Sequence, residues 1–318
     1  MLILEDLSAE IPDTNAFHWD LKKFSTDDKK VALFYGYNSI INLDHLFTTK
    51  GYKRILFNNW APCEFAQEFS HPNKAPLDVE KQMNVIYSIC PYSVEWLNNL
   101  NLGREYRSIY YPYCETLIPN KVDKKYDIIY HGGIHGIEHS NCLSVLRKFN
   151  YRFCSMTNGI NQYTQNHLPL ATNLNLSFRD KIKLIAETKI SVCYNFVHVM
   201  PEQVSRIQKL KNLPGKNEAF DTVGTWNIMP QFKTRIHEAS FSHTLNLVRK
   251  DPWNVIERYY EPDKDFIYFN DEKDLEKKIK DILGNWELHE YQNMIESAYR
   301  KSKKYTTNEF IDKIRGEV

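Results

Sequence analysis

The sequence predicts an α/β protein built from two Rossmann-like domains, and three observations support this prediction. Short, almost wholly apolar runs alternate with helical patterns along most of the chain, which is typical of parallel sheets whose strands are buried on both faces. With 318 residues, the chain is longer than a single hydrophobic core usually organises. The alternation is interrupted once, over about fifteen residues, which is long for a loop within one compact domain.

The first half of the chain contains four strand-like runs. They are VALFY from Val31, RILFN from Arg54, NVIYSI from Asn84 and RSIYY from Arg107. Each is short and rich in β-branched or aromatic residues, as buried parallel strands are. The segment YSVEWLNNL after Pro91 has a helical pattern and is the clearest candidate for a crossover between two of these strands. The spacing therefore indicates βαβ units.

The interruption is the segment YPYCETLIPNKVDKKYD, in which Pro112, Pro119 and a charged cluster break the periodicity. We place the domain boundary there. The prediction is a first domain over 1–118 and a second over 119–296. The remaining residues, 297–318, have a helical pattern with one basic face, and we expect them to pack back on the first domain.

The alternation then resumes and predicts a second α/β domain. Strands are expected at DIIYH from Asp127, YRFCS, ISVCYN, TLNLV and DFIYF, and helices at CLSVLRKF, at FRDKIKLIAETK and just after Pro252. The best-marked helix follows DFIYF, because Asn270 or Asp271 can cap its start. Apolar residues recur in it at helical spacing and a glycine stands where a C-terminal cap belongs, namely at Leu275, Ile279, Ile282 and Gly284.

Composition and charge exclude several classes of protein. Hydrophobic residues make up 42% and charged residues 25% of the chain, as in globular proteins. Lys and Arg number 41 against 40 Asp and Glu, so no long-range positive field favours nucleic acid as a partner. The six cysteines form no Cys-x-x-Cys pair, which argues against a zinc knuckle and a disulfide framework.

The N-terminal residues carry Glu5 and Asp6 and lack a basic region, so we expect no signal peptide. No stretch approaches the roughly 20 apolar residues that span a bilayer, so we expect no transmembrane segment. These two expectations together predict a cytoplasmic protein.

Ligands of doubly wound sheets bind beyond the carboxyl ends of the strands, so the residues that follow each apolar run are the candidate site. In the first domain these residues are polar, aromatic and uncharged. Amides can bond hydroxyl groups and aromatic rings can cover C–H faces, which suits a sugar or another polyol. We therefore predict acceptor contacts there, with ordinary loop residues as the alternative. The candidates are Tyr37, Asn38, Asn59 and Trp60.

In the second domain, DIIYH runs into HGGIHG. Gly132 and Gly133 would let backbone amides approach an anion at a helix N-terminus, and a plain tight turn is the alternative. The Gly-x-Gly-x-x-Gly fingerprint would need a glycine at His131, so a nicotinamide or flavin cofactor is disfavoured. His135 and His139 are four residues apart, but no acidic or thiolate ligand accompanies them, so we expect no metal and keep only His131 as a substrate contact.

The segment MPQFKTRIHEASFSHTLNLVRKDPWNVIE predicts a short amphipathic helix that leads into a buried strand. Lys233 and Arg235 at its start would add about two positive charges where a diphosphate needs neutralising. Glu238, one turn further, could accept hydrogen bonds from ribose hydroxyls. The alternative is a helical ion pair between Arg235 and Glu238, which is common on surfaces and contributes only a few tenths of a kcal/mol.

Three segments, KTRIHEASFSHTLNLV, DPWNVIERYYEPDKDFIYF and NDEKDLEKKIKDIL, together resemble the donor-binding half of glycosyltransferases with the GT-B fold. The resemblance is to the group-1 and spore-maturation-type branches and covers residues 229–283 well. YDIIYHGG and KIKLIAETKISVCYN resemble the first strand and a middle βα unit of the same domain. The resemblance implies two Rossmann-like domains that face each other across a cleft.

The resemblance also implies roles for single residues. Glu238 would hold the donor ribose, and Lys233 and Arg235 would lie beside the diphosphate. The other donor-binding residues that it implies are the amides at the next helix start and the end of the ISVCYN strand, namely Trp253, Asn254, Val255 and Asn195.

There are two departures from the family pattern. Pro230 stands where many retaining members carry a second Glu, and His243 replaces the usual glycine of the Glu-Ala motif. The retaining or inverting outcome therefore stays open. An inverting reaction needs a base from the first domain, for which His18, Asp20 and Glu64 are unranked candidates.

The resulting hypothesis is a metal-independent glycosyltransferase, a hexosyl- or pentosyltransferase. It would move a sugar from a nucleotide-sugar donor, UDP- or GDP-linked, to a hydroxyl of a glycan or glycoconjugate, with no cofactor. Two alternatives remain open. One is a non-catalytic nucleotide- or sugar-binding protein on the same fold, and the other is a nucleotide-sugar epimerase.

Overall fold

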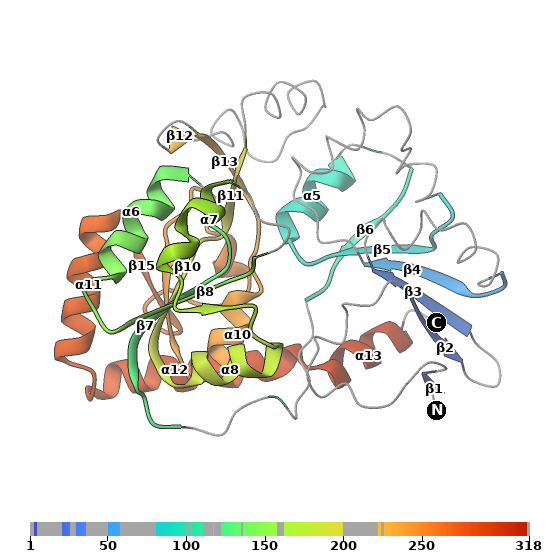
Figure 1. Ribbon diagram of the computed structural model, residues 1–318. Helices are drawn as coiled ribbons and strands as arrows, with labels where there is room; N and C mark the ends of the chain where they lie inside the picture. The colour runs from blue at the N-terminus through green and yellow to red at the C-terminus, as the bar shows by residue number, and fades with distance from the viewer. Residues whose placement is uncertain are drawn as a thin grey trace. The chain divides into compact units, whose positions relative to one another are not determined.

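The computed structural model divides the chain into two compact units, each with its own six-stranded sheet (Figure 1). The first unit comprises Met1–Cys114, Val199–Ala219 and Tyr305–Val318, and the second comprises Glu115–His198 and Phe220–Lys304. The structure describes residues 3–4, 21–25, 30–35, 50–57, 81–99, 101, 103–110, 117, 122–134, 136–157, 162–199, 222–223 and 226–316.

The sheet of the first unit has the strand order β1-β2-β3-β4-β5-β6. Its four predicted strands are confirmed as β3, β4, β5 and β6, which pair in parallel. The sequence patterns missed the two short strands β1 and β2, which extend the sheet in antiparallel fashion. The strand bounds are Ile3–Leu4, Leu21–Ser25, Lys30–Tyr35, Lys53–Phe57, Val85–Ser88 and Tyr106–Ser108.

The described residues of this unit include two helices. The predicted crossover is α5 (Pro91–Asn99), which starts at a proline, as first helical positions favour, and buries Trp96 completely. Helix α13 (Thr307–Gly316) lies beside β6: Lys313 Nζ donates to the Ser108 carbonyl at 3.0 Å, and the buried Phe310 ring meets the ring of Tyr110 edge-on.

The sheet of the second unit is wholly parallel and has the order β15-β14-β10-β7-β8-β9. The chain starts at β7, moves outward to β8 and β9, and then returns to the other side of β7 to form β10. The order therefore reverses between β7 and β10, where doubly wound sheets bind ligands. The bounds are Tyr126–His131, Tyr151–Ser155, Asn173–Leu174, Thr188–Cys193, Leu245–Arg249 and Phe266–Phe269 for β7, β8, β9, β10, β14 and β15.

Helices cover this sheet in two groups: α11 packs against α6, and α10 packs against α8 and α12. Ile182, Ile185 and Ala239 join Ile129 in one hydrophobic cluster beneath α8 and α10. The helices are α6 (Gly136–Leu146), α7 (Gln162–His167), α8 (Phe178–Ala186), α10 (Arg235–Phe241), α11 (Glu272–Gly284) and α12 (His289–Ser302), with 3-10 turns at Leu168–Leu170, Val255–Arg258 and Lys303–Tyr305.

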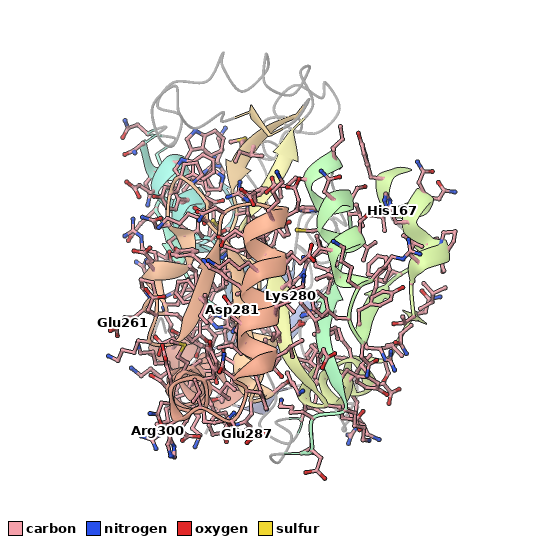
Figure 2. All side chains as sticks on the ribbon, turned by 90° about the vertical axis from the view of Figure 1, so that its left-hand side faces the viewer. His167, Glu261, Lys280, Asp281, Glu287 and Arg300 are labelled. Atoms are coloured by element: carbon pink, nitrogen blue, oxygen red, sulfur yellow. The ribbon has the colours of Figure 1, made fainter. Side chains whose placement is uncertain are left out.

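Helix α11 confirms the predicted N-terminal cap and buried face, whereas the predicted C-terminal cap is wrong, because Gly284 is the last helical residue and Asn285 is the cap. The Asp271 carboxylate accepts from the backbone amides of Lys273 and Asp274, and Leu275, Ile279 and Ile282 are buried. Lys280 and Asp281 lie on its exposed side (Figure 2).

A small sheet that the sequence analysis did not predict carries the chain into α10. It has the order β11-β13-β12, with bounds Phe196–Val199, Trp226–Pro230 and Thr222–Val223.

Helix α10 differs from its prediction. It begins at Arg235, so Lys233 precedes the helix, and it is not amphipathic, because every residue from Ile236 to Phe241 is buried. Among the described residues, no helix is long and apolar enough to cross a membrane.

Candidate functional site

The candidate site lies at the carboxyl edge of the second sheet, where the strand order reverses. His131 is the last residue of β7, and Asn195 follows β10 by two residues. Helix α10 begins at this edge because it runs back beneath the sheet to β14, and it contributes Arg235 and Glu238. The predicted donor-site residues of β7, β10 and α10 are thus assembled at one edge.

Gly132 provides the space for the Arg235 guanidinium. A Cβ built on Gly132 would come within 2.9 Å of Arg235 Nε and closer still to Cζ and Nη2. Gly132 also has a φ of +128°, which L side chains rarely adopt. The glycine that was expected to expose backbone amides to an anion therefore accommodates an arginine instead, and its own amide donates to the Cys154 carbonyl at 3.0 Å.

The hydrogen-bond partner of Arg235 is an uncharged phenol. Its Nη1 lies 3.4 Å from the Tyr130 hydroxyl, and its guanidinium stands 5.5 Å from the centre of the same ring. Burial raises the pKa of Tyr130, so the phenol stays neutral at physiological pH. In the part of the chain that the structure describes, no carboxylate lies within ion-pair distance of this guanidinium, so the alternative of an Arg235–Glu238 ion pair is wrong.

Glu238 is paired with two other residues. Its Oε1 lies 2.9 Å from Lys181 Nζ on α8, and its Oε2 lies 3.2 Å from His131 Nδ1. Burial alone raises the pKa of Glu238, but the Lys181 ammonium and the His131 ring outweigh burial and bring the pKa far below its usual value. Glu238 is therefore an ionised carboxylate although only 4% of it is exposed.

His131 links Glu238 to the next strand. Burial lowers the pKa of His131 more than Glu238 raises it, so the ring is neutral at physiological pH. The contact with Glu238 Oε2 falls short of hydrogen-bond geometry, but a proton on Nδ1 is the tautomer that the neighbouring carboxylate favours, because a carboxylate only accepts. The other nitrogen, Nε2, is then an acceptor for the Ser191 hydroxyl at 3.3 Å. His131 is thus an internal partner of Glu238, whereas the sequence had suggested a direct substrate contact.

Asn195 fixes the approach to α10. Its Oδ1 accepts from the Lys233 amide at 3.1 Å, and its carbonyl accepts from the Gln231 amide at 3.0 Å. Asn195 is fully buried, and its Nδ2 has no hydrogen-bond partner among the residues that the structure describes. The Lys233 ammonium bonds to Gln231 Oε1, close to where the family pattern has an acidic side chain.

The amides around Trp253 are occupied, contrary to the expected phosphate cradle. Asp251 Oδ1 accepts from the amides of Trp253 at 3.0 Å and Val255 at 3.2 Å, and the Asp251 carbonyl accepts from Asn254. Asn254 adopts a left-handed conformation with φ 52°. Burial raises the pKa of Asp251 to about 6, although these amide bonds oppose the shift. An internal carboxylate thus takes the place expected for a phosphate.

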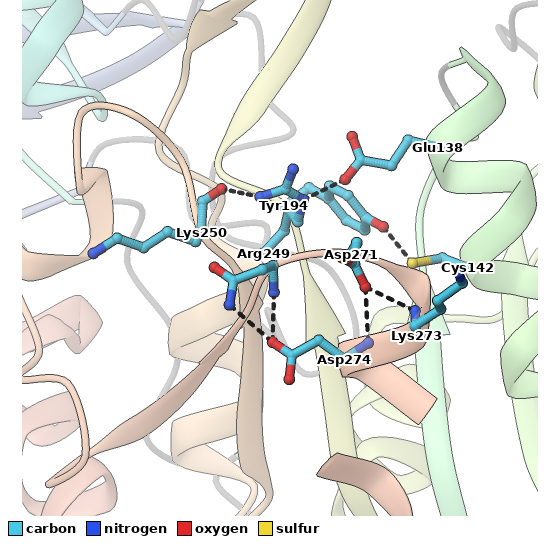
Figure 3. A network of polar contacts seen from close by, with 9 residues as sticks. Glu138, Cys142, Tyr194, Arg249, Lys250, Asp271, Lys273 and Asp274 are labelled. Carbon is cyan, nitrogen blue, oxygen red and sulfur yellow. Dashed lines mark hydrogen bonds and ion pairs between the residues drawn. The ribbon is translucent and has the colours of Figure 1, made fainter. Parts of the chain in front are cut away.

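A second charged pair at the same edge was not found from the sequence. Glu138, in the first turn of α6, pairs with Arg249 at the end of β14, and Arg249 also donates to the Lys250 carbonyl (Figure 3). Glu138 Oε2 is buried and has no hydrogen-bond partner within the described part of the chain. Nothing local in the sequence indicates this pair, because its members stand 111 residues apart.

The metal expectation concerns three histidines. His131 contacts Glu238, and His139 packs against the Tyr194 ring with centroids 3.9 Å apart. Both side chains are therefore part of the domain interior. His135 lies outside the described residues. No group of three metal-ligating side chains occurs in the part of the chain that the structure describes.

The predicted residues of the first domain lie outside the described residues. They are the acceptor candidates Tyr37, Asn38, Asn59 and Trp60 and the base candidates His18, Asp20 and Glu64.

Neither a protein-family model nor a curated protein matches the sequence. Solved structures do match. Anabaena Alr3699/HepE in complex with UDP and glucose has 8% identity and a TM-score of 0.56 over 90% of this chain and 78% of its own. Sucrose-phosphate synthase from Thermosynechococcus elongatus has 11% identity and a TM-score of 0.56, covering 90% and 72%. The pneumococcal O-GlcNAc transferase GtfA, in complex with UDP and GlcNAc, has 10% identity and a TM-score of 0.52, covering 93% and 62%.

At these identities the likeness concerns the fold. It agrees with the two mainly parallel sheets, one in each unit, and with the strand reversal in the second. The predicted architecture is confirmed: the chain has the α/β GT-B fold with two Rossmann-like domains.

Proposed function

We propose that this protein is a glycosyltransferase that uses a nucleotide-sugar donor, and that Arg235 binds the donor diphosphate. One observation carries the proposal: among the described residues, a half-buried guanidinium at the strand-reversal edge has only a neutral phenol as its hydrogen-bond partner. Charges that leave water are normally paired, so an uncompensated cation in this place favours an anionic ligand.

The neighbouring groups fit the rest of a nucleotide. Glu238 stands three residues after Arg235 and hence on the same face of α10. An ionised carboxylate accepts hydrogen bonds and donates none, which suits the two hydroxyls of a ribose. Lys233 lies just before Arg235 and adds a second positive charge beside the diphosphate, with Asn195 holding its backbone in place.

Two charged side chains can neutralise a leaving diphosphate without a metal ion, and the proposal is therefore a metal-independent reaction. The first domain would bind the glycan or glycoconjugate that carries the acceptor hydroxyl. For an inverting reaction it would also supply the base. UDP is the first donor nucleotide to test, because it is named for two of the matching structures, Anabaena Alr3699/HepE and GtfA.

The test is a panel of UDP-, GDP- and dTDP-sugars in the presence of EDTA. We expect at least one donor to stabilise the folded protein against heat and to be hydrolysed slowly without an acceptor. Arg235→Gln should abolish both effects, whereas the exposed Arg258→Gln should abolish neither. A folded protein that responds to no member of the panel would contradict the proposal.

One observation favours a non-catalytic binding protein as the second candidate. Pro230 is buried at the end of β13, so the acidic group that many retaining enzymes carry there is missing. Such a protein would bind the nucleotide but turn nothing over with any acceptor. A nucleotide-sugar epimerase, the other alternative, would convert the donor without an acceptor, and chromatography of the sugar product distinguishes all three outcomes.

A further inference from the structure

Glu238 is a buried carboxylate that contacts from two other elements hold in place. It is 4% exposed, in the middle of a short helix that is buried all round, and each of its two oxygens faces a different nitrogen. Lys181 approaches Oε1 from α8, and His131 approaches Oε2 from the end of β7. Three separate elements therefore converge on one carboxylate.

The His131 ring lies between Glu238 and Ser191. Its Nδ1 is 3.2 Å from Glu238 Oε2, a polar contact whose geometry falls short of a hydrogen bond, and its Nε2 is 3.3 Å from the Ser191 hydroxyl. Ser191 is fully buried in β10, and His131 is its only side-chain partner among the described residues. Removing the hydroxyl would remove the contact that holds the Nε2 side of the ring, and with it one restraint on the ring beside Glu238.

Lys181 is the partner that solvent can reach. Its side chain is 27% exposed, and its ammonium also lies 4.6 Å from the centre of the Phe178 ring on the same helix. The ring and the carboxylate together hold the ammonium in one position. A cation on Oε1 neutralises the buried charge and leaves the remaining acceptor directions of the carboxylate for a ligand.

We infer that Lys181 and the Ser191–His131 pair are positioning residues, which hold Glu238 so that it accepts both hydroxyls of a ribose and thereby selects ribonucleotides over 2′-deoxyribonucleotides. The inference rests on the proposed function, because it concerns the same nucleotide site. It goes further in naming residues of α8 and β10 that do not touch the nucleotide and yet set its sugar specificity.

The test compares the affinity of UDP and GDP with that of their 2′-deoxy counterparts by calorimetry. A hydrogen bond to a charged group contributes enough that we expect the wild-type protein to prefer the ribonucleotide about tenfold. Lys181→Met should lower this ratio to about threefold at pH 7, and Lys181→Arg should largely restore it. Lys183→Met is the matched control, because Lys183 is exposed on the same helix, and it should leave the ratio unchanged.

Ser191→Ala is the second variant and acts on Glu238 only through His131. It should lower the ratio less than Lys181→Met does, with an unchanged thermal transition showing that the protein is folded. Lowering the pH from 7 to 5 should reduce the remaining preference of Lys181→Met but leave the wild type unaffected, because without the ammonium burial raises the pKa of Glu238. A purely structural role of Lys181 would not produce this pH dependence.

The experiments distinguish a failure of the proposed function from a failure of the positioning roles. If the folded wild-type protein binds no nucleotide, the proposed function is overturned and this inference with it. If it binds nucleotides and the folded Lys181→Met and Ser191→Ala variants keep the wild-type ratio, only the positioning roles are overturned.

Discussion

The Arg235 guanidinium occupies the space that a side chain on Gly132 would fill. The glycine directly follows β7 and the arginine begins α10, so the absence of one side chain allows the other to lie across the edge of the sheet. We predict that Gly132→Ala displaces Arg235 and weakens nucleotide diphosphate binding at least tenfold, about 1.4 kcal/mol, besides destabilising the fold through its φ of +128°.

Gly284→Ala is the control for this variant. No atom lies within 4 Å of a Cβ built there, and Gly284 is the last residue of α11. We expect it to leave nucleotide affinity unchanged and to keep or slightly raise the melting temperature. Calorimetry and thermal unfolding of both variants check the prediction, and unaltered affinity in Gly132→Ala would show that the guanidinium can shift without loss.

Arg235 itself should show opposite effects on binding and stability. Its half-buried charge lacks a carboxylate partner in the described residues, which costs free energy in the unliganded protein. We expect Arg235→Met to keep the packing of the stem, to raise or preserve the melting temperature, and to abolish nucleotide binding. Thermal unfolding with and without UDP measures both effects. A clear drop in the melting temperature of the unliganded variant would indicate a structural role instead.

Asp251 should make stability depend on pH. Burial raises the pKa of its carboxyl to about 6 in the folded protein, above the ordinary value of 3.8. The folded state therefore binds the proton more tightly than the unfolded state. The stability that this contributes is fully present below about pH 4 and is lost as the pH rises to about 6.

The test variant is Asp251→Asn, whose side-chain oxygen can still accept from the Trp253 and Val255 amides. We expect it to remove this pH dependence, which amounts to roughly 2–3 kcal/mol for a shift of about two pKa units. Urea unfolding between pH 4 and 7 gives the measurement. Parallel curves for the variant and the wild type would contradict the assignment.

Removing one member of the Glu138–Arg249 pair should lower the free energy of unfolding more than replacing both members with apolar residues. Glu138→Ala leaves the Arg249 guanidinium without its carboxylate in a place where it is 19% exposed, and we expect a loss of about 3 kcal/mol. The double variant Glu138→Leu with Arg249→Met should recover much of that stability. A double-mutant cycle by urea unfolding gives the coupling, and additive losses would show that the two charges act independently.

The sequence by itself determined five strands of the main sheet of the second domain and its best-marked helix, and it pointed to a candidate site. Strands such as Tyr151–Ser155 and the capped helix Glu272–Gly284 follow from local patterns, because burial on both faces and helix capping involve residues close together in the chain. The rule that ligands bind where parallel strands end then pointed to His131 and to the start of α10.

Only the tertiary structure decided which side chains are partners there. Arg235 meets Tyr130 across 105 residues and Glu238 meets Lys181 across 57, whereas helical spacing had suggested that the arginine and the glutamate pair with each other. Likewise, Asp251 takes amides that the family pattern assigns to a phosphate. Such pairings depend on how elements distant in the sequence pack and on the cost of burying each charge, and no local pattern encodes either.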